Sequence, residues 1–150
     1  MVDKNQYLIS LSETLCPLVW DAPLKELSAP EQVIVCVYEL EREVNNGGFD
    51  QFFRNSPGQY VLETVQALEA IGAPSMAEIT RNAVALAFPD GNIPADQDER
   101  SDILDAAGET LGEQLSKLDD RFYEYPDDLT ELLFSYVQVN RDSIRGAEPA

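Results

Sequence analysis

The residues best placed to do chemistry in this sequence are carboxylates that recur at helical spacing between residues 98 and 120. On a helical wheel, six of them fall in one sector, separate from an apolar sector: Asp98, Asp102, Asp105, Glu109, Glu113 and Asp120. A helix rises ~1.5 Å per residue, so neighbours in such a row lie roughly 5–6 Å apart, within a factor of two of the ~3.4 Å axial phosphate repeat of one DNA strand. A protein surface that holds phosphates with lysine and arginine can accept such a row instead.

The net charge favours the same kind of partner. The chain has 28 acidic and 10 basic residues, a formal charge of −18 and a pI of about 4.1. Residues 90–131 alone hold 14 acidic residues against three basic ones, which accounts for −11 of this charge. Such a molecule repels nucleic acid and anionic membranes and attracts cations or basic proteins. Two other interpretations stay open, because a solvated helix face and adaptation to high salt also concentrate acids on a surface.

Composition excludes many kinds of catalytic site. The sequence contains no histidine, so Ser-His-Asp and Cys-His catalytic groups and histidine-ligated zinc sites are absent. Neither of the glycine motifs G-x-x-x-x-G-K-[ST] and G-x-G-x-x-G, which bind phosphates, occurs. The segment PDGNIPADQDERSD faintly resembles a calcium loop but lacks the central glycine and the final glutamate, which leaves only weak cation binding in residues 90–102. We therefore expect no enzymatic activity, no cofactor and no metal site.

Cysteine usage and the start of the sequence indicate a compartment. Cys16 and Cys36, the only cysteines, lie in apolar runs, which is typical of reduced thiols in a protein core. A disulfide between them is the alternative. The first 20 residues lack the basic and then continuously apolar pattern of a signal peptide, and no run approaches the roughly 18 apolar residues that span a bilayer. We expect a cytoplasmic protein with a single acidic helical domain over residues 1–150.

The apolar pattern is helical along nearly the whole chain. Ser28 and Glu31 form an S-x-x-E capping box with Pro30 in the first turn, so a helix is expected to begin there and to continue through Val44. Other helices are expected near residues 8–19, 60–71, 74–88, 98–122 and 126–145. The sequence thus predicts an all-α fold, a single compact bundle of about seven helices.

The stretch NNGGFDQFFRNSPG, residues 45–58, interrupts this pattern and indicates a tight corner between two helices. Gly47 or Gly48 can take the left-handed conformation that satisfies the last carbonyls of the first helix. The three phenylalanines that follow share one side of a short second helix, which is the spacing of side chains that fill a core. Asn55 is suited to end that second helix.

The same stretch carries a resemblance to a known family. The pattern N-G-G-F-x-Q-F-F-x-N-x-x-G, followed by ALEAIGA, resembles the signature of a bacterial DNA-mimic protein family first described as a domain of unknown function. The matching residues lie between about Ser28 and Phe88 and have the character of fold residues: Asn46, Gly47, Gly48, Phe49, Gln51, Phe52, Phe53, Asn55, Gly58, Leu68 and Gly72. The resemblance implies an acidic, all-helical, dimeric protein that occupies the DNA-binding face of a transcription regulator.

Three hypotheses about function follow from these observations. The first is a DNA mimic that binds a basic DNA-binding protein, a transcription regulator, through the six acids of the wheel sector. The second is an inhibitor or immunity-like protein that blocks a basic enzyme such as a nuclease. The third is an acid-coated domain with no charge-dependent partner. The first two both set acids against a basic cleft, so the sequence alone separates them poorly.

Overall fold

The computed structural model describes residues 2–149 and confirms the predicted all-α fold, with six α-helices in place of about seven. These are α1 (Lys4–Leu15), α2 (Ala29–Arg54), α3 (Val61–Ala70), α4 (Pro74–Ala87), α5 (Gln97–Tyr123) and α6 (Leu129–Val139). Four short 3-10 helices join them: η1 (Cys16–Val19), η2 (Leu24–Glu26), η3 (Ser56–Tyr60) and η4 (Arg141–Ser143). No strand occurs within residues 2–149, and none of the helices there is long and apolar enough to cross a membrane.

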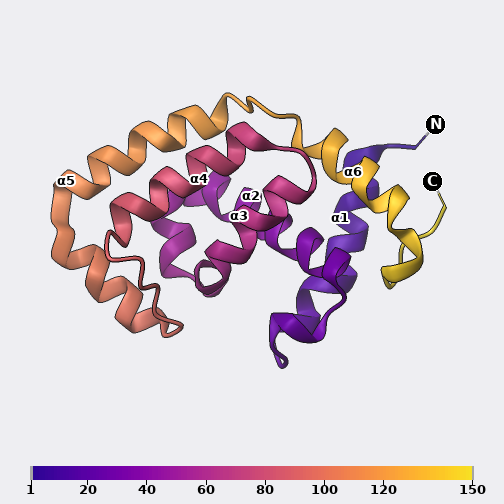
Figure 1. Ribbon diagram of the computed structural model, residues 1–150, viewed down its shortest axis with the longest axis horizontal. Coiled ribbons are helices and arrows are strands. Elements are labelled where there is room, and N and C mark those ends of the chain that lie inside the picture. Colours follow the sequence, from indigo (N-terminus) through magenta and orange to yellow (C-terminus); the bar gives the residue numbers. More distant parts are fainter. Residues whose placement is uncertain (1, 150) are drawn as a thin grey trace.

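Helix α2 forms the centre of the molecule. Helices α3 and α5 pack against it, and α4 packs against both α3 and α5. Helix α5 curves round the outside of this group, while α1 and α6 pack together at the other end, near both termini (Figure 1). This arrangement leaves one side of α5 facing solvent along its length.

Helix α2 begins at the predicted capping box. The Ser28 hydroxyl accepts a hydrogen bond from the Glu31 backbone N–H at 3.2 Å, and the Glu31 carboxylate accepts one from the Ser28 N–H at 2.9 Å. The same carboxylate accepts hydrogen bonds from the Arg145 guanidinium at 2.9 and 3.0 Å. These bonds from Arg145 lower the pKa of Glu31 to about 2, although its burial opposes the shift. The C-terminal segment is thereby tied to the start of α2.

The predicted corner is present and bends α2. Gly47 (φ −157°, ψ 21°) and Gly48 (φ 75°, ψ −177°) depart from helical geometry, and helical turns resume at Phe49. Of the two, only Gly48 adopts a conformation that other residues disfavour. Asn55 ends the helix, as the sequence predicts.

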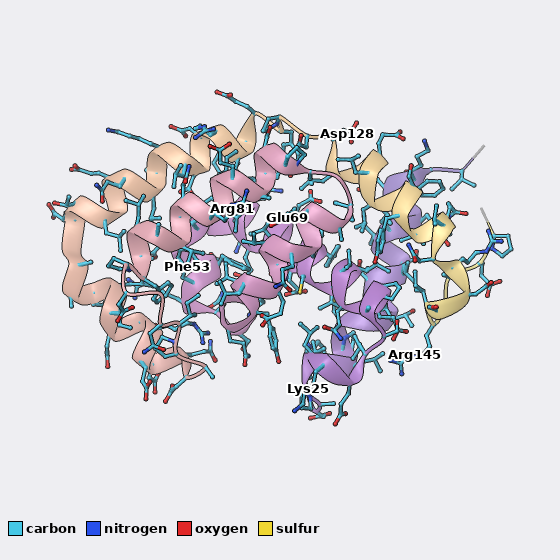
Figure 2. The ribbon with its side chains drawn as sticks, viewed as in Figure 1. Lys25, Phe53, Glu69, Arg81, Asp128 and Arg145 are labelled. Carbon is cyan, nitrogen blue, oxygen red and sulfur yellow. The ribbon has the colours of Figure 1, made fainter. Side chains whose placement is uncertain are left out.

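The phenylalanines after the corner lie in the core. Phe49, Phe52 and Phe53 are each 0% exposed. The ring of Phe53 meets that of Phe88 edge to face with centroids 5.3 Å apart, and Phe49 meets Phe122 of α5 in the same way at 5.9 Å. Figure 2 places Phe53 among the central helices. The corner therefore directs three aromatic rings into the core, one of them against α5 and one against Phe88 at the end of α4.

The C-terminal helix is shorter than predicted. Helix α6 ends at Val139 and a 3-10 turn covers Arg141–Ser143, whereas the spacing predicted a helix up to Arg145. Ile144 is extended and buried, and Arg145 turns back to bind Glu31. Contacts with the start of α2 therefore override the local helical pattern.

Candidate functional site

Helix α5 carries the predicted acidic row, but it is not straight. It begins after Asp96, whose side chain accepts a hydrogen bond from the Asp98 N–H at 2.8 Å, and it bends at Gly108, where φ is 71° and ψ is −158° (Figure 1). The placement of residues 98–122 on one straight helical wheel is therefore wrong, because wheel angles do not carry across a non-helical residue. Ala107, whose angle on a straight wheel falls in the apolar sector with Leu104 and Leu111, is exposed.

Each half of α5 nevertheless has its own acidic face. All six predicted carboxylates are exposed: Asp98, Asp102, Asp105, Glu109, Glu113 and Asp120. All of them except Asp105 lie two positions along the helix from a buried residue of α5. Two positions correspond to about 200° round a helix, so these five side chains point away from the core.

Asp105 has a different position. It directly follows the buried Leu104 and so lies on the flank of α5, where its Oδ1 is 2.9 Å from Nη2 of Arg54. The Arg54 guanidinium also pairs with Asp50 at 3.0 Å, and hydrogen bonds to Asp50 and Asp105 raise the pKa of Arg54. Asp105 thus links α5 to the end of α2, and it is the least available of the six to an outside cation.

Arg100 anchors the first half of α5. Its side chain is fully buried, with Nε donating to the Phe53 carbonyl at 2.7 Å and Nη2 to the Asn55 carbonyl at 2.8 Å. Its Nη1 donates to the carbonyls of Pro94 and Ala95 at 2.9 and 2.8 Å. Burial lowers the pKa of Arg100, and the carbonyls at the C-terminal end of α2 take the place of a carboxylate partner. Arg100 entered the sequence-based predictions only in the count of basic residues. Its position four residues before Leu104, which places both side chains on the same face of a helix, is the signal that could have indicated its burial.

Asp119 anchors the second half of α5. Its Oδ1 accepts a hydrogen bond from the backbone N–H of Phe49 at 2.8 Å, so a carboxylate from α5 caps the helical turns that follow the bend in α2. A Cβ added to Gly48 would lie 2.9 Å from Cγ of Asp119 and closer still to Oδ2. Burial raises the pKa of Asp119. The glycine that bends α2 therefore also makes room for the residue that holds α5, a contact that sequence spacing does not reveal.

Two tyrosines complete the attachment at the C-terminal end of α5. The Tyr123 hydroxyl donates to the Val44 carbonyl at 2.8 Å. The Tyr125 hydroxyl donates to the Glu41 carboxylate at 2.9 Å and accepts from the Asn45 amide at 2.8 Å. Burial raises the pKa of Tyr125 to about 12, so this hydroxyl stays protonated near neutral pH. The outer acids of α5 are thus held on a helix that is fastened at both ends.

The acidic segment before α5 is organised by backbone contacts. Asp90 accepts a hydrogen bond from the Asn92 N–H at 2.9 Å, and Asp96 caps α5. The faint likeness of residues 90–102 to a calcium loop therefore corresponds to a turn and a helix cap. Within residues 2–149, no group of three or more histidine, cysteine, aspartate or glutamate side chains is placed to hold a metal ion.

Comparison with known protein families gives a match that covers both the corner in α2 and helix α5. A family model described as DMP19-like protein matches residues 25–140, which is more than half of the chain and includes both the corner and all of α5. The chain belongs to this family. The match extends well past residues 28–88, which carry the resemblance noted in the sequence, so the helix with the outward acids falls within the family region. Neither the curated proteins nor the solved structures include a match to the chain.

Proposed function

We propose that this protein is a DNA mimic that binds the DNA-binding face of a basic protein and blocks its DNA binding. The observation that carries the proposal is the outward carboxylate row on each half of α5, held by the buried Arg100 and the half-buried Asp119. Membership of the DMP19-like family, whose name is that of a DNA mimic, supports it. The partner we propose is a transcription regulator.

The charge balance of α5 favours a basic partner. The helix exposes seven acidic side chains against two basic ones, Lys117 and Arg121. Like charges one turn apart destabilise a helix by a few tenths of a kcal/mol per pair, so this surface is retained against a small energetic cost. Lys25 and Arg145, two of the basic residues, lie on the side of the molecule away from α5 (Figure 2). The resulting negative potential steers basic proteins towards α5 and repels nucleic acid.

The bend at Gly108 divides the acids into two rows. At ~1.5 Å per residue, the outward row from Asp98 to Asp102 is about 6 Å long and the row from Glu109 to Asp120 is about 16 Å long. Because each half is fastened to α2 separately, the carboxylates keep fixed intervals, as phosphates do along a nucleic acid strand. We expect each row to face its own group of lysine or arginine side chains on the partner.

Neutralising the outer row tests the proposal. The partner is first isolated by pull-down at two ionic strengths, and its affinity is then measured against a variant with Asp102→Asn, Glu109→Gln and Glu113→Gln. Each exposed ion pair contributes about 0.2–1 kcal/mol, so binding should weaken roughly threefold to hundredfold and depend less on salt. The fold should survive, because these three side chains face water.

A second triple variant is the control for net charge. Glu13→Gln, Glu26→Gln and Asp142→Asn remove three exposed acids from α1, η2 and η4, at the other end of the molecule. We expect this variant to bind the partner almost as tightly as the original protein does. Equal weakening by both triples would show that only the total charge matters, and no weakening by the first would refute the role of α5. If the isolated partner is a nuclease, the same surface would instead support the inhibitor hypothesis.

A further inference from the structure

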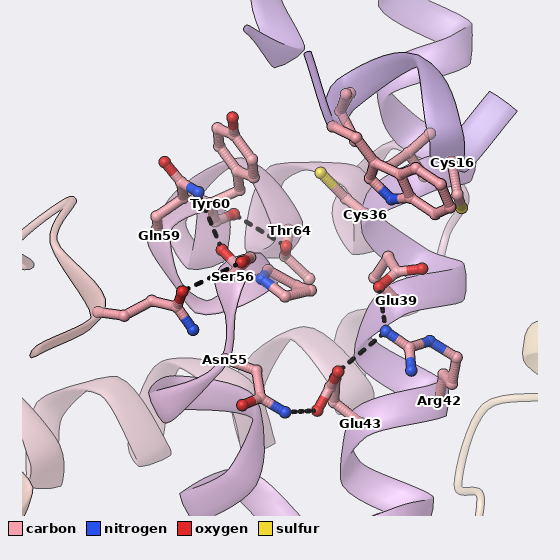
Figure 3. A pocket seen from close by; sticks show the side chains of 15 residues that line it. Cys16, Cys36, Glu39, Arg42, Glu43, Asn55, Ser56, Gln59, Tyr60 and Thr64 are labelled. Carbon is pink, nitrogen blue, oxygen red and sulfur yellow. Dashed lines mark hydrogen bonds and ion pairs between the residues drawn. The ribbon is translucent and has the colours of Figure 1, made fainter. Parts of the chain in front are cut away.

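A cleft of about 530 Å³ opens between the turn after α1, the middle of α2 and the start of α3 (Figure 3). Cys16 and Trp20 line it near η1, Glu39 and Glu43 line it along α2, and Tyr60 lines it from η3. Its volume falls within the ~300–1,000 Å³ typical of sites that bind small groups. The proposed DNA mimicry by α5 makes no use of it.

One wall of the cleft holds an organised pair of carboxylates. Glu43 is only 2% exposed, and its Oε2 accepts hydrogen bonds from the amides of Gln51 at 2.9 Å and Asn55 at 2.8 Å. The Arg42 Nη2 atom bridges Oε1 of Glu43 at 2.9 Å and Oε2 of Glu39 at 2.6 Å (Figure 3). Two residues that follow the corner, Gln51 and Asn55, therefore orient a buried carboxylate beside an open cleft.

Thiol and aromatic groups line the cleft beside these carboxylates. Trp20 is the only tryptophan in the chain, and 78% of its surface is exposed. Cys16 and Cys36 are free and buried, which confirms the expectation of unbridged core thiols. Burial, together with the nearby Glu39, raises the pKa of the Cys16 thiol, so this group is neutral near pH 7. An exposed indole and carboxylates that line the same cleft are a combination that binds organic cations.

We propose that this cleft receives an arginine side chain from a basic protein partner. The carboxylates of Glu39 and Glu43 accept its N–H groups, and the indole of Trp20 covers its planar face. Arg42 shows that this pair of carboxylates accepts a guanidinium, because its own guanidinium already bridges them. The Arg42 side chain is half exposed, so it has room to share the carboxylates with a second cation or to move aside.

Charge and position both favour this occupant. Two carboxylates and one guanidinium line the cleft, and the whole chain has a formal net charge of −18. Both net charges repel an anionic ligand and attract a cationic one. Gln97, the first residue of α5, also lines the cleft, which therefore opens beside the acidic row that starts at Asp98. A partner seated on α5 can extend one arginine into it. The inference rests on the proposed function for the source of that arginine, but not for the chemistry of the cleft.

The fluorescence of Trp20 reports occupancy directly, since no other tryptophan contributes. The probe is the peptide acetyl-glycyl-arginyl-glycine amide, and the matched control peptide has citrulline, which keeps the shape and removes the charge. We expect a saturable change with the arginine peptide, confirmed by calorimetry, and affinity for citrulline at least about tenfold weaker. Glu39→Gln should weaken the arginine peptide about tenfold. Asp142→Asn, which removes the same charge from η4, outside both the cleft and α5, should change it less than about twofold.

Arg42→Gln should have the opposite effect on affinity for the arginine peptide to that of Glu39→Gln. Removing the internal guanidinium leaves both carboxylates open to the probe, so the arginine peptide should bind several-fold more tightly, with a melting curve confirming that the variant is folded. The inference would be overturned if both peptides bound equally, or if neither method detected binding. It would also be overturned if Glu39→Gln and Asp142→Asn had equal effects, or if folded Arg42→Gln bound the arginine peptide more weakly. Affinity for the isolated partner separates the two proposals. If the α5 triple variant weakens partner binding and Glu39→Gln does not, the cleft does not receive the partner's arginine and the proposed mimicry stands. If Glu39→Gln weakens partner binding and the α5 triple does not, the proposed mimicry is refuted.

Discussion

Replacing Gly48 with alanine tests how the corner in α2 holds the acidic helix. Gly48 has φ 75° and ψ −177°, a conformation that costs a residue with a side chain about 1–3 kcal/mol. The added Cβ would also meet the Asp119 carboxylate and displace it from the Phe49 N–H, with the loss of a helix cap worth about 1 kcal/mol. Together these effects should lower the free energy of unfolding by about 2–4 kcal/mol.

Thermal melting followed by circular dichroism measures this loss. For a chain of this size, each kcal/mol lowers Tm by about 2–4 °C, so Gly48→Ala should lower Tm by roughly 4–16 °C. Gly108→Ala is a matched control, because Gly108 has φ 71° and ψ −158° while an added Cβ there has nothing within 4 Å. It should suffer only the backbone cost. The difference between the two variants isolates the contact with Asp119.

Removing the carboxylate gives the refuting experiment. In an Asp119→Ala background the collision is gone, so Gly48→Ala should cost no more than Gly108→Ala does. The reasoning fails if Gly48→Ala and Gly108→Ala are equally destabilising in the original protein. It fails equally if Asp119→Ala leaves the cost of Gly48→Ala unchanged.

Two further predictions concern the other anchors. Arg100→Met should lower the free energy of unfolding by about 3–5 kcal/mol, because it leaves buried carbonyls unpaired. Amide hydrogen exchange should then accelerate more in the first half of α5 than in the second. Uniform acceleration along α5 would contradict the role of Arg100 as the anchor of the first half. Glu31 has its pKa lowered from 4.5 to about 2, so its stabilising effect is complete above pH 4.5 and is lost as the pH falls towards 2. Denaturation at several pH values measures the free energy of unfolding of the original protein and of Glu31→Gln. The difference between the two should vanish as the pH falls from 4.5 to about 2. A difference that stays constant with pH would show that the ion pair between Glu31 and Arg145 is not its source.

Local sequence signals predicted most of the fold. The capping box at Ser28, the corner at Gly48 and the end of the second helix at Asn55 each depend on residues within one or two turns, so spacing was enough to find them. The bend at Gly108 was missed, because an isolated glycine is compatible with a continuous helix and only packing decides otherwise. The early end of α6 was missed for a similar reason, since Arg145 bonds to a residue 114 positions away.

The candidate site was predictable residue by residue but not as an arrangement. Exposure of the six acids followed from helical spacing, which survives within each half of α5. Their division into two rows, and the pairing of Asp105 with Arg54, depend on the bend and on α2. The buried carboxylate of Glu43 was also missed, because it resembles any other acid of a polar helix until Gln51 and Asn55 fold back onto it.

The most direct test of DNA mimicry by α5 is competition between this protein and DNA for one partner. The isolated partner is bound to fluorescently labelled DNA, and this protein is added in increasing amounts while the fluorescence anisotropy is followed at constant salt. Mimicry predicts that DNA is released in proportion to the protein added, and that the variant with Asp102→Asn, Glu109→Gln and Glu113→Gln needs a higher concentration for the same release. A stable complex that contains the partner, its DNA and this protein together would contradict the account.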